Sequence, residues 1–105
     1  MEMVRALIRP ERESAVIDAL EKEGFVSLTK MHVFGRGRQK GLQVGPITYD
    51  ELPKVQLTLV VNDEDTPKVV GIIEGAARTG NIGDGKIFVS EVSDVYTIRT
   101  GEKGL

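Results

Sequence analysis

Two glycine-rich stretches with positive charge are the segments of this sequence best suited to chemistry. The first, the basic stretch (residues 35–41, GRGRQKG), contains Arg36, Arg38 and Lys40. The second, the glycine loop (residues 79–86, TGNIGDGK), ends in Lys86. Glycine lets backbone N–H groups approach a ligand closely, and the cations supply charge, so both stretches suit an anion such as a phosphate. Taken alone, the basic stretch is explained equally well as a solvated loop, and the glycine loop is explained better as a helix-to-strand turn.

The glycine loop also satisfies the pattern GxxxxGK from Gly80 to Lys86, the core of a P-loop. We reject that interpretation because Ile87 follows the lysine, where a P-loop has a Ser or Thr for Mg²⁺. The predicted order is also helix, loop, strand, whereas a P-loop joins a strand to a helix. What remains is a glycine loop that ends in a cation.

Arg99, in a polar stretch near the end of the chain, is a third candidate for anion binding. One charge-assisted hydrogen bond contributes about 1.5 to 3 kcal/mol, whereas micromolar binding needs about 8 kcal/mol. Neither glycine stretch comfortably supplies that alone. We therefore expect Arg38, Lys86 and Arg99 to converge with backbone donors on one polyphosphate, in a composite site.

The sequence offers few residues that could form a catalytic or metal-binding site. His32 is the only histidine, lies in a strand pattern and is interpreted as structural, and cysteine is absent, so neither thiol catalysis nor a transition-metal site is expected. The contiguous acids Asp63, Glu64 and Asp65 are typical of a solvated turn and a helix N-terminus. Tyr49 is interpreted as an ordinary loop tyrosine.

Composition bounds the class of protein. The chain has 105 residues, 14 Lys+Arg against 16 Asp+Glu and 40% hydrophobic residues, which suits one globular domain. An acidic pI of about 5.4 argues against a general nucleic-acid binder, although residues 24–49 contain no acid at all. The first residues carry neither a signal-peptide pattern nor a long apolar stretch, so we expect a cytoplasmic protein without stable membrane insertion.

These loops must be positioned by alternating strands and helices. Apolar patterns predict strands at 3–9, 25–34, 55–61 and 86–90, helices at about 10–24 and 63–80, and a long loop from Gly35 to about Pro53. This order is the ferredoxin-like βαββαβ pattern, an α+β fold with an antiparallel sheet covered by helices on one face. Because the strands are apolar on both faces, we expect an oligomer that buries the open sheet face.

The two loops together resemble the PII signal-transduction family over essentially the whole chain. Residues 79–89 (TGNIGDGKIFV) fit the C-terminal signature of that family, and residues 35–41, 52–54 (LPK) and 98–101 (IRTG) support the match. The resemblance implies a single PII-like domain over 1–105, assembled as a trimer. It also implies ATP or ADP in clefts between subunits and a mobile partner-binding loop at about 37–53, between the second and third predicted strands.

The family's site residues carry over position by position. The implied nucleotide contacts are Thr29, Gly37, Arg38, Val60, Gly83, Asp84, Gly85, Lys86 and Arg99. The resemblance further implies that Gln39 ligates Mg²⁺ bound to ATP. Implied binders of 2-oxoglutarate are Gln39, Lys40, Gly41 and Lys54. The chain departs from the family pattern at Thr97, where a phosphate-binding arginine is usual, and at Thr58, where many relatives have an adenine-side glutamate.

The short loop and the run YDELPK at 49–54 resemble most the nitrogenase-associated PII branch, especially the first of its paired proteins. That resemblance implies a non-catalytic regulator that inhibits dinitrogenase directly until 2-oxoglutarate and ATP relieve it. It also implies a homotrimer or a hetero-oligomer with a second PII-like subunit. The alternatives are a general PII regulator of an ammonium transporter or nitrogen-assimilation enzyme, a small nucleotide-using enzyme, and a structural trimer without ligands.

Overall fold

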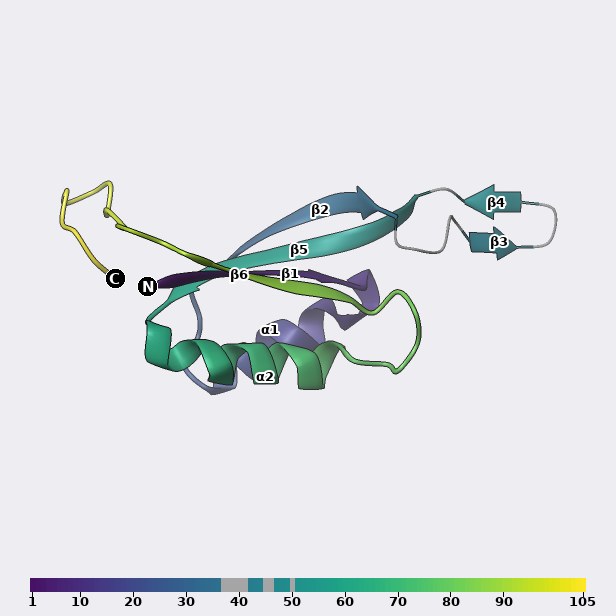
Figure 1. Ribbon diagram of the computed structural model, residues 1–105, viewed down its shortest axis with the longest axis horizontal. Coiled ribbons are helices and arrows are strands. Elements are labelled where there is room, and N and C mark those ends of the chain that lie inside the picture. The colour runs from purple at the N-terminus through teal and green to yellow at the C-terminus, as the bar shows by residue number, and fades with distance from the viewer. Residues whose placement is uncertain (37–41, 45–46, 50) are drawn as a thin grey trace.

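A computed structural model describes residues 1–36, 42–44, 47–49 and 51–105 of the chain, and its main feature is a four-stranded antiparallel sheet. The strands are β1 (Glu2–Ile8), β2 (Thr29–Gly35), β5 (Leu52–Val61) and β6 (Gly85–Glu91), in the spatial order β2-β5-β1-β6. Helices α1 (Glu13–Lys22) and α2 (Thr66–Ala77), each preceded by a short 3₁₀ helix, η1 (Pro10–Arg12) or η2 (Asp63–Asp65), both cover one face of it (Figure 1). The predicted ferredoxin-like α+β fold is confirmed.

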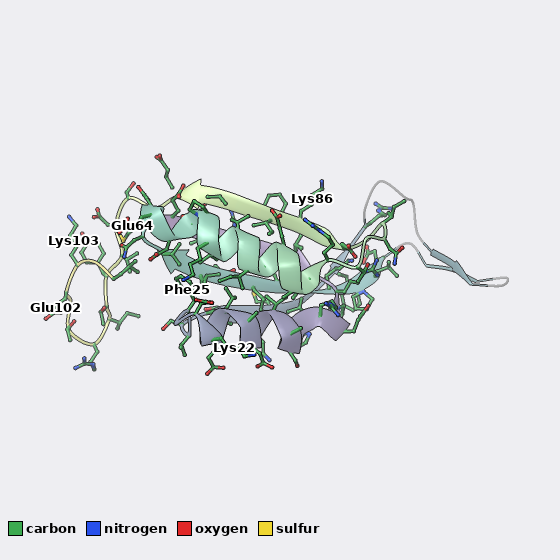
Figure 2. The ribbon with its side chains drawn as sticks, turned by 90° about the horizontal axis from the view of Figure 1, so that it is seen from below. Lys22, Phe25, Glu64, Lys86, Glu102 and Lys103 are labelled. Atoms are coloured by element: carbon green, nitrogen blue, oxygen red, sulfur yellow. The ribbon has the colours of Figure 1, made fainter. Side chains whose placement is uncertain are left out.

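Period-2 burial along the central strands builds the core. In β5 the side chains of Val55, Leu57, Leu59 and Val61 are buried, whereas the residues between them are only partly buried, as expected of a strand with one face in the core. Residues on one face of each helix pack against them, and Figure 2, seen from below, shows both helices in front of the sheet. The other buried apolar residues are Val4, Ala6 and Ile8 of β1, Val16 and Leu20 of α1, and Val69, Ile73 and Ala77 of α2.

The opposite sheet face carries apolar and basic residues. The strand register places these side chains on the sheet face that points away from the helices. Met31 and Phe88, which belong to this face, are about half exposed, at 51% and 47%. The remaining members of this open face include Met3, Arg5, Leu7, Val33, Lys54, Val60 and Lys86. In the described strands none of its residues is acidic. An apolar sheet face left open in this way agrees with the sequence-based expectation.

Two segments differ from expectation. The strand predicted to begin at residue 25 begins at Thr29, because helix α1 ends in a turn in which the Gly24 and Phe25 N–H groups donate to Glu21 O and Leu20 O at 3.0 and 2.9 Å. Within the expected loop of residues 35–53 lie two paired strands, β3 (Leu42–Val44) and β4 (Ile47–Tyr49), beyond one end of the main sheet (Figure 1). Strands of three residues are too short to show a clear period.

After β6 the chain forms a terminal extension, defined here as residues 92–105, at the other end of the sheet (Figure 1). Its first residue is tied to the sheet by a hydrogen bond from Val92 N to Met1 O at 3.1 Å. A single bridge between Tyr96 and Lys103 pairs two residues of this extension. Neither helix of the described chain has the length and apolar composition of a membrane span.

Candidate functional site

The glycine loop connects the end of α2 to the start of β6, in the helix, loop, strand order on which the P-loop interpretation was rejected. The carboxylate of Asp84 organises it. Thr79 N and Gly80 N donate to Asp84 Oδ2 at 2.8 and 2.9 Å, and the Thr79 hydroxyl donates to Asp84 Oδ1. The pKa of Asp84 is held well below its usual value. The main cause is the hydrogen bonds from Thr79, and Arg9 and Gly80 are further donors.

Arg9 completes this arrangement from the end of β1. Its Nε donates to Asp84 Oδ1 at 3.0 Å, its Nη2 donates to the Ile82 carbonyl at 2.8 Å, and both ion-pair side chains are only 24% exposed. Sequence reasoning did not single out Arg9. The sequence carries no signal for it, because only the strand register, which pairs Ile8 with Gly85, places the residue after Ile8 next to the residue before Gly85.

Gly85 is required where the loop enters β6. Its φ is +109°, and a Cβ atom there would lie 1.7 Å from the carbonyl oxygen of Leu7 on β1. No side chain fits at that distance, so the close approach of the loop to β1 depends on glycine. The close approach seen here is to the protein's own backbone, and the sequence-based expectation that the glycines let a ligand approach stays a prediction.

Two lysines lie at the same end of the sheet. The Lys54 ammonium group donates to the carbonyl of Gly83, and burial, followed by the nearby Arg9, lowers the Lys54 pKa. Lys86 is opposite Leu7 in register, on the open face. Three cations, Arg9, Lys54 and Lys86, therefore lie around the glycine loop, and Asp84 and Glu11 are the carboxylates that act on Lys54. Cations in excess beside exposed backbone make this end suitable for an anion.

The remaining predicted contacts fall into three groups. Thr29 lies directly opposite Thr58 on the open face, and Val60 lies opposite Met3, further along the sheet from the glycine loop. Residues 37–41, with Gly37, Arg38, Gln39, Lys40 and Gly41, lie outside the described residues. Arg99 lies in the terminal extension, at the opposite end of the sheet from the start of β6 (Figure 1). One chain therefore does not bring Arg99 to Lys86.

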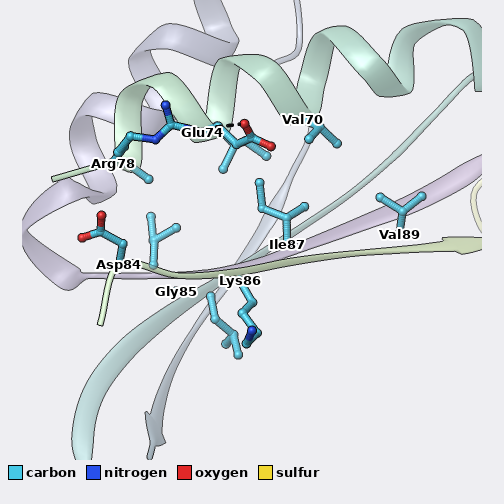
Figure 3. Close-up of a pocket in the computed structure, with 12 residues that line it drawn as sticks. Val70, Glu74, Arg78, Asp84, Gly85, Lys86, Ile87 and Val89 are labelled. Atoms are coloured by element: carbon cyan, nitrogen blue, oxygen red, sulfur yellow. Dashed lines mark hydrogen bonds and ion pairs between the residues drawn. The ribbon is translucent and has the colours of Figure 1, made fainter. Parts of the chain in front are cut away.

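A pocket of about 350 Å³ lies between α2 and β6, on the helix side of the sheet (Figure 3). Val70, Ile87 and Val89 contribute to its apolar lining, and an ion pair between Arg78 and Glu74 at 3.3 Å lies at its edge. In Figure 3 the Lys86 side chain projects to the opposite side of the strand from Ile87. Leu7, Asp84 and Lys86 also line this pocket, so it adjoins the glycine loop, although the Lys86 side chain is directed to the open face.

In the described part of the chain, no three His, Cys, Asp or Glu side chains come together in a way that could hold a metal. His32 lies in β2 as predicted, and it is exposed rather than packed in the core. Asp63 lies in η2 just before α2, as predicted, and its carboxylate binds the N-terminal amino group at 2.8 Å.

In terms of class, the structure is a ferredoxin-like α+β domain with a glycine loop suited to an anion. The sequence profile described as nitrogen regulatory protein P-II matches residues 1–102, and the chain belongs to that family. It is 56% identical to the nitrogen fixation nifHD1 region GlnB-like protein 1 of Methanosarcina barkeri and 50% identical to the nifHD region GlnB-like protein 1 of Methanothermococcus thermolithotrophicus, over 100% of each chain.

A further relative has a more general name. The chain is 47% identical to nitrogen regulatory protein P-II 2 of Methanothermobacter thermautotrophicus, over 99% of this chain and 94% of the relative. The predicted resemblance to the PII family, and within it to the nitrogenase-associated branch, is confirmed by these matches. The protein is thus a nitrogen regulator of the PII family whose relatives include proteins of nitrogen-fixation regions.

Proposed function

We propose that the protein is a non-catalytic, cytoplasmic signal transducer that binds ATP or ADP and 2-oxoglutarate and controls nitrogen fixation by contacting dinitrogenase. The observation that carries this proposal is the position of Lys54 and Lys86 at one end of the sheet, beside a glycine loop that Arg9 holds through Asp84. A nucleotide polyphosphate is the anion that matches several cations together with backbone donors. Membership of a regulatory family supports signalling rather than turnover.

The nucleotide site needs a second copy of the chain. Lys86 lies at the start of β6 and Arg99 in the extension beyond its other end, and this strand of seven residues spans about 20 Å. The terminal extension of one copy would bring Arg99 to the glycine loop of its neighbour, and the apolar open face would be buried between copies. We propose a homotrimer, or a hetero-oligomer with a second PII-like subunit, as the assembly that achieves both.

The effector site would join the nucleotide to the long loop. Gln39 would ligate the Mg²⁺ of bound ATP, and Lys40, Gly41 and Lys54 would hold the 2-oxoglutarate carboxylates. Lys54 donates a hydrogen bond to Gly83 of the glycine loop, which supports coupling between the binding of the two ligands. A ligand controls the arrangement of the 37–53 loop only through different affinity for its two states, typically by about 1 to 3 kcal/mol.

The target is proposed from the named relatives. Two relatives that are 56% and 50% identical to the chain are named for nitrogen-fixation regions, which supports dinitrogenase. The 47% identical P-II protein supports a second candidate function, general regulation of an ammonium transporter or a nitrogen-assimilation enzyme. A pull-down from nitrogen-fixing cells separates the two, because recovery of a transporter without dinitrogenase contradicts the first.

Calorimetry of ATP binding, with and without Mg²⁺ and 2-oxoglutarate, tests both ligand sites and their coupling. We expect tighter ATP binding in the presence of both effectors. The Arg38→Ala variant should weaken binding of ATP and 2-oxoglutarate together. Unchanged affinity of this variant for both ligands would contradict the site, and sustained ATP hydrolysis by the wild type would favour an enzyme instead.

A further inference from the structure

The Arg9 side chain reaches three successive residues of the glycine loop. Its Nε and Nη2 donate to the Asp84 carboxylate and to the Ile82 carbonyl, at 3.0 and 2.8 Å. It also packs against Gly83, because a Cβ atom at that position would lie 3.2 Å from Nη2. The planar fork of arginine allows one side chain to bind a carboxylate and a carbonyl together, which a lysine ammonium group cannot do with the same geometry.

The carboxylate that Arg9 holds closes the loop upon itself. Asp84 accepts hydrogen bonds from Thr79 N and Gly80 N, at the start of the loop, and from Arg9, on another strand. Its oxygens are therefore engaged with the protein. An uncompensated carboxylate two residues before Lys86 would repel an anion at that lysine, and the ion pair with Arg9 compensates the charge.

We propose that Arg9 is a positioning residue of the nucleotide site, which holds Asp84 and Ile82 so that the glycine loop keeps the shape that receives a phosphate beside Lys86. The proposal rests on the proposed nucleotide-binding function. It gives Asp84 a different role from the ligand contact that the family resemblance implies. Asp84 is the internal anchor of the loop, and Arg9 acts on the ligand through this anchor rather than by touching it.

Hydrogen exchange of the ligand-free protein tests the positioning role without any nucleotide. In Arg9→Met the amides of Thr79 and Gly80 should exchange about tenfold faster than in the wild type, because loss of the ion pair frees their acceptor. Core amides such as that of Leu57 should keep their protection, which shows that the variant is folded. Arg78→Met is the matched control, since Arg78 adjoins the loop but makes only an exposed ion pair with Glu74. Unchanged exchange in Arg9→Met would overturn the proposal.

A double-mutant cycle measured by calorimetry distinguishes positioning from direct contact. Arg9→Met should weaken ATP binding about tenfold in the wild-type background and only about twofold or less when Asp84 is already Asn. Arg9→Lys, which keeps the charge without the fork, should fall between wild type and Arg9→Met. An equal loss in both backgrounds would show that Arg9 contacts the ligand and would contradict the proposal. A wild type that binds no ATP would instead refute the proposed function, and the exchange experiment would still decide whether Arg9 organises the loop.

Discussion

The glycine loop and the terminal extension are both irregular segments with charged residues, yet they are held in opposite ways. Arg9 and Lys54, from two strands of the main sheet, hold the glycine loop through Asp84, Ile82 and Gly83. Beyond Val92, the hydrogen bonds and ion pairs of the described extension join its own residues, such as Gly104 N to Val95 O at 2.7 Å. The loop is complete within one chain.

The extension also exposes apolar side chains in the described structure. Ile98 is fully exposed, and Tyr96 and Leu105 are more than half exposed. Exposed apolar side chains on a segment beyond the sheet suit contact with another molecule, because they add nothing to the core of their own chain. The comparison teaches that the loop belongs to the fold of one chain, whereas the role proposed for the extension requires a neighbouring copy.

The largest effect is expected where the loop touches the sheet. Gly85→Ala should cost more than about 3 kcal/mol of unfolding free energy, because its Cβ would overlap the Leu7 carbonyl oxygen and a positive φ disfavours any side chain. Urea unfolding measures this loss. The control is Gly71→Ala in α2, where a Cβ meets nothing within 4 Å and which should be stabilised by about 0.5 to 1 kcal/mol. Equal effects of the two variants would contradict the tight approach to β1.

A smaller loss is expected at Arg12, which anchors the helix that leads into the loop. Its Nε and Nη2 both donate to the Ala76 carbonyl, at 3.0 and 2.6 Å, near the end of α2. Arg12→Met should lower the unfolding free energy by about 1.5 to 3 kcal/mol in urea unfolding, since these bonds are charge-assisted and partly buried. Arg78→Met should change it by less than about 0.5 kcal/mol, because its ion pair is exposed. If Arg12→Met lowers the unfolding free energy as little as Arg78→Met does, the bonds from Arg12 to Ala76 do not stabilise the fold.

The pH dependence of stability should report the anchor of the loop. The pKa of Asp84 is depressed in the folded protein, so the unfolded chain binds its proton more tightly. The stability that ionised Asp84 contributes is therefore fully present above about pH 4 and decreases as pH falls below that value. Urea midpoints of wild type and Asp84→Asn should differ at neutral pH and approach each other in acid. A constant difference across this range would show that the carboxylate charge does not matter.

The smallest effect on the fold is expected in the extension. Ile98→Ser should leave the unfolding free energy of the chain within about 0.5 kcal/mol, because the Ile98 side chain is already fully exposed. The same substitution should weaken assembly about tenfold, measured by sedimentation over a range of concentrations, if the side chain is buried by a neighbour. Unchanged assembly together with unchanged stability would leave the extension without the role proposed for it.

Much of the fold could be predicted because its cause is local or periodic. The alternation of Val55, Leu57 and Leu59 and the helical spacing of Val69 and Ile73 show in the sequence which faces are buried, and the structure agrees. Strands β3 and β4 could not be predicted, because three residues carry too little pattern.

The candidate site was only partly predictable for a different reason. The glycines and Lys86 of the loop are recognisable by type, but the bond between Arg9 and Asp84 joins residues 75 positions apart. Only the register of β1 with β6 brings them together. In the proposed assembly the position of Arg99 relative to Lys86 depends on a second chain, and no pattern within one copy contains that information.

Complementation between two defective variants tests the central claim most directly, namely that the loop of one copy and the extension of another form one site. Lys86→Ala and Arg99→Ala should each bind ATP poorly when assembled alone. After joint unfolding and reassembly, a minority of sites pairs an intact loop with an intact extension, and calorimetry should find wild-type affinity at those sites. A mixture that binds ATP no better than either variant alone would contradict the claim.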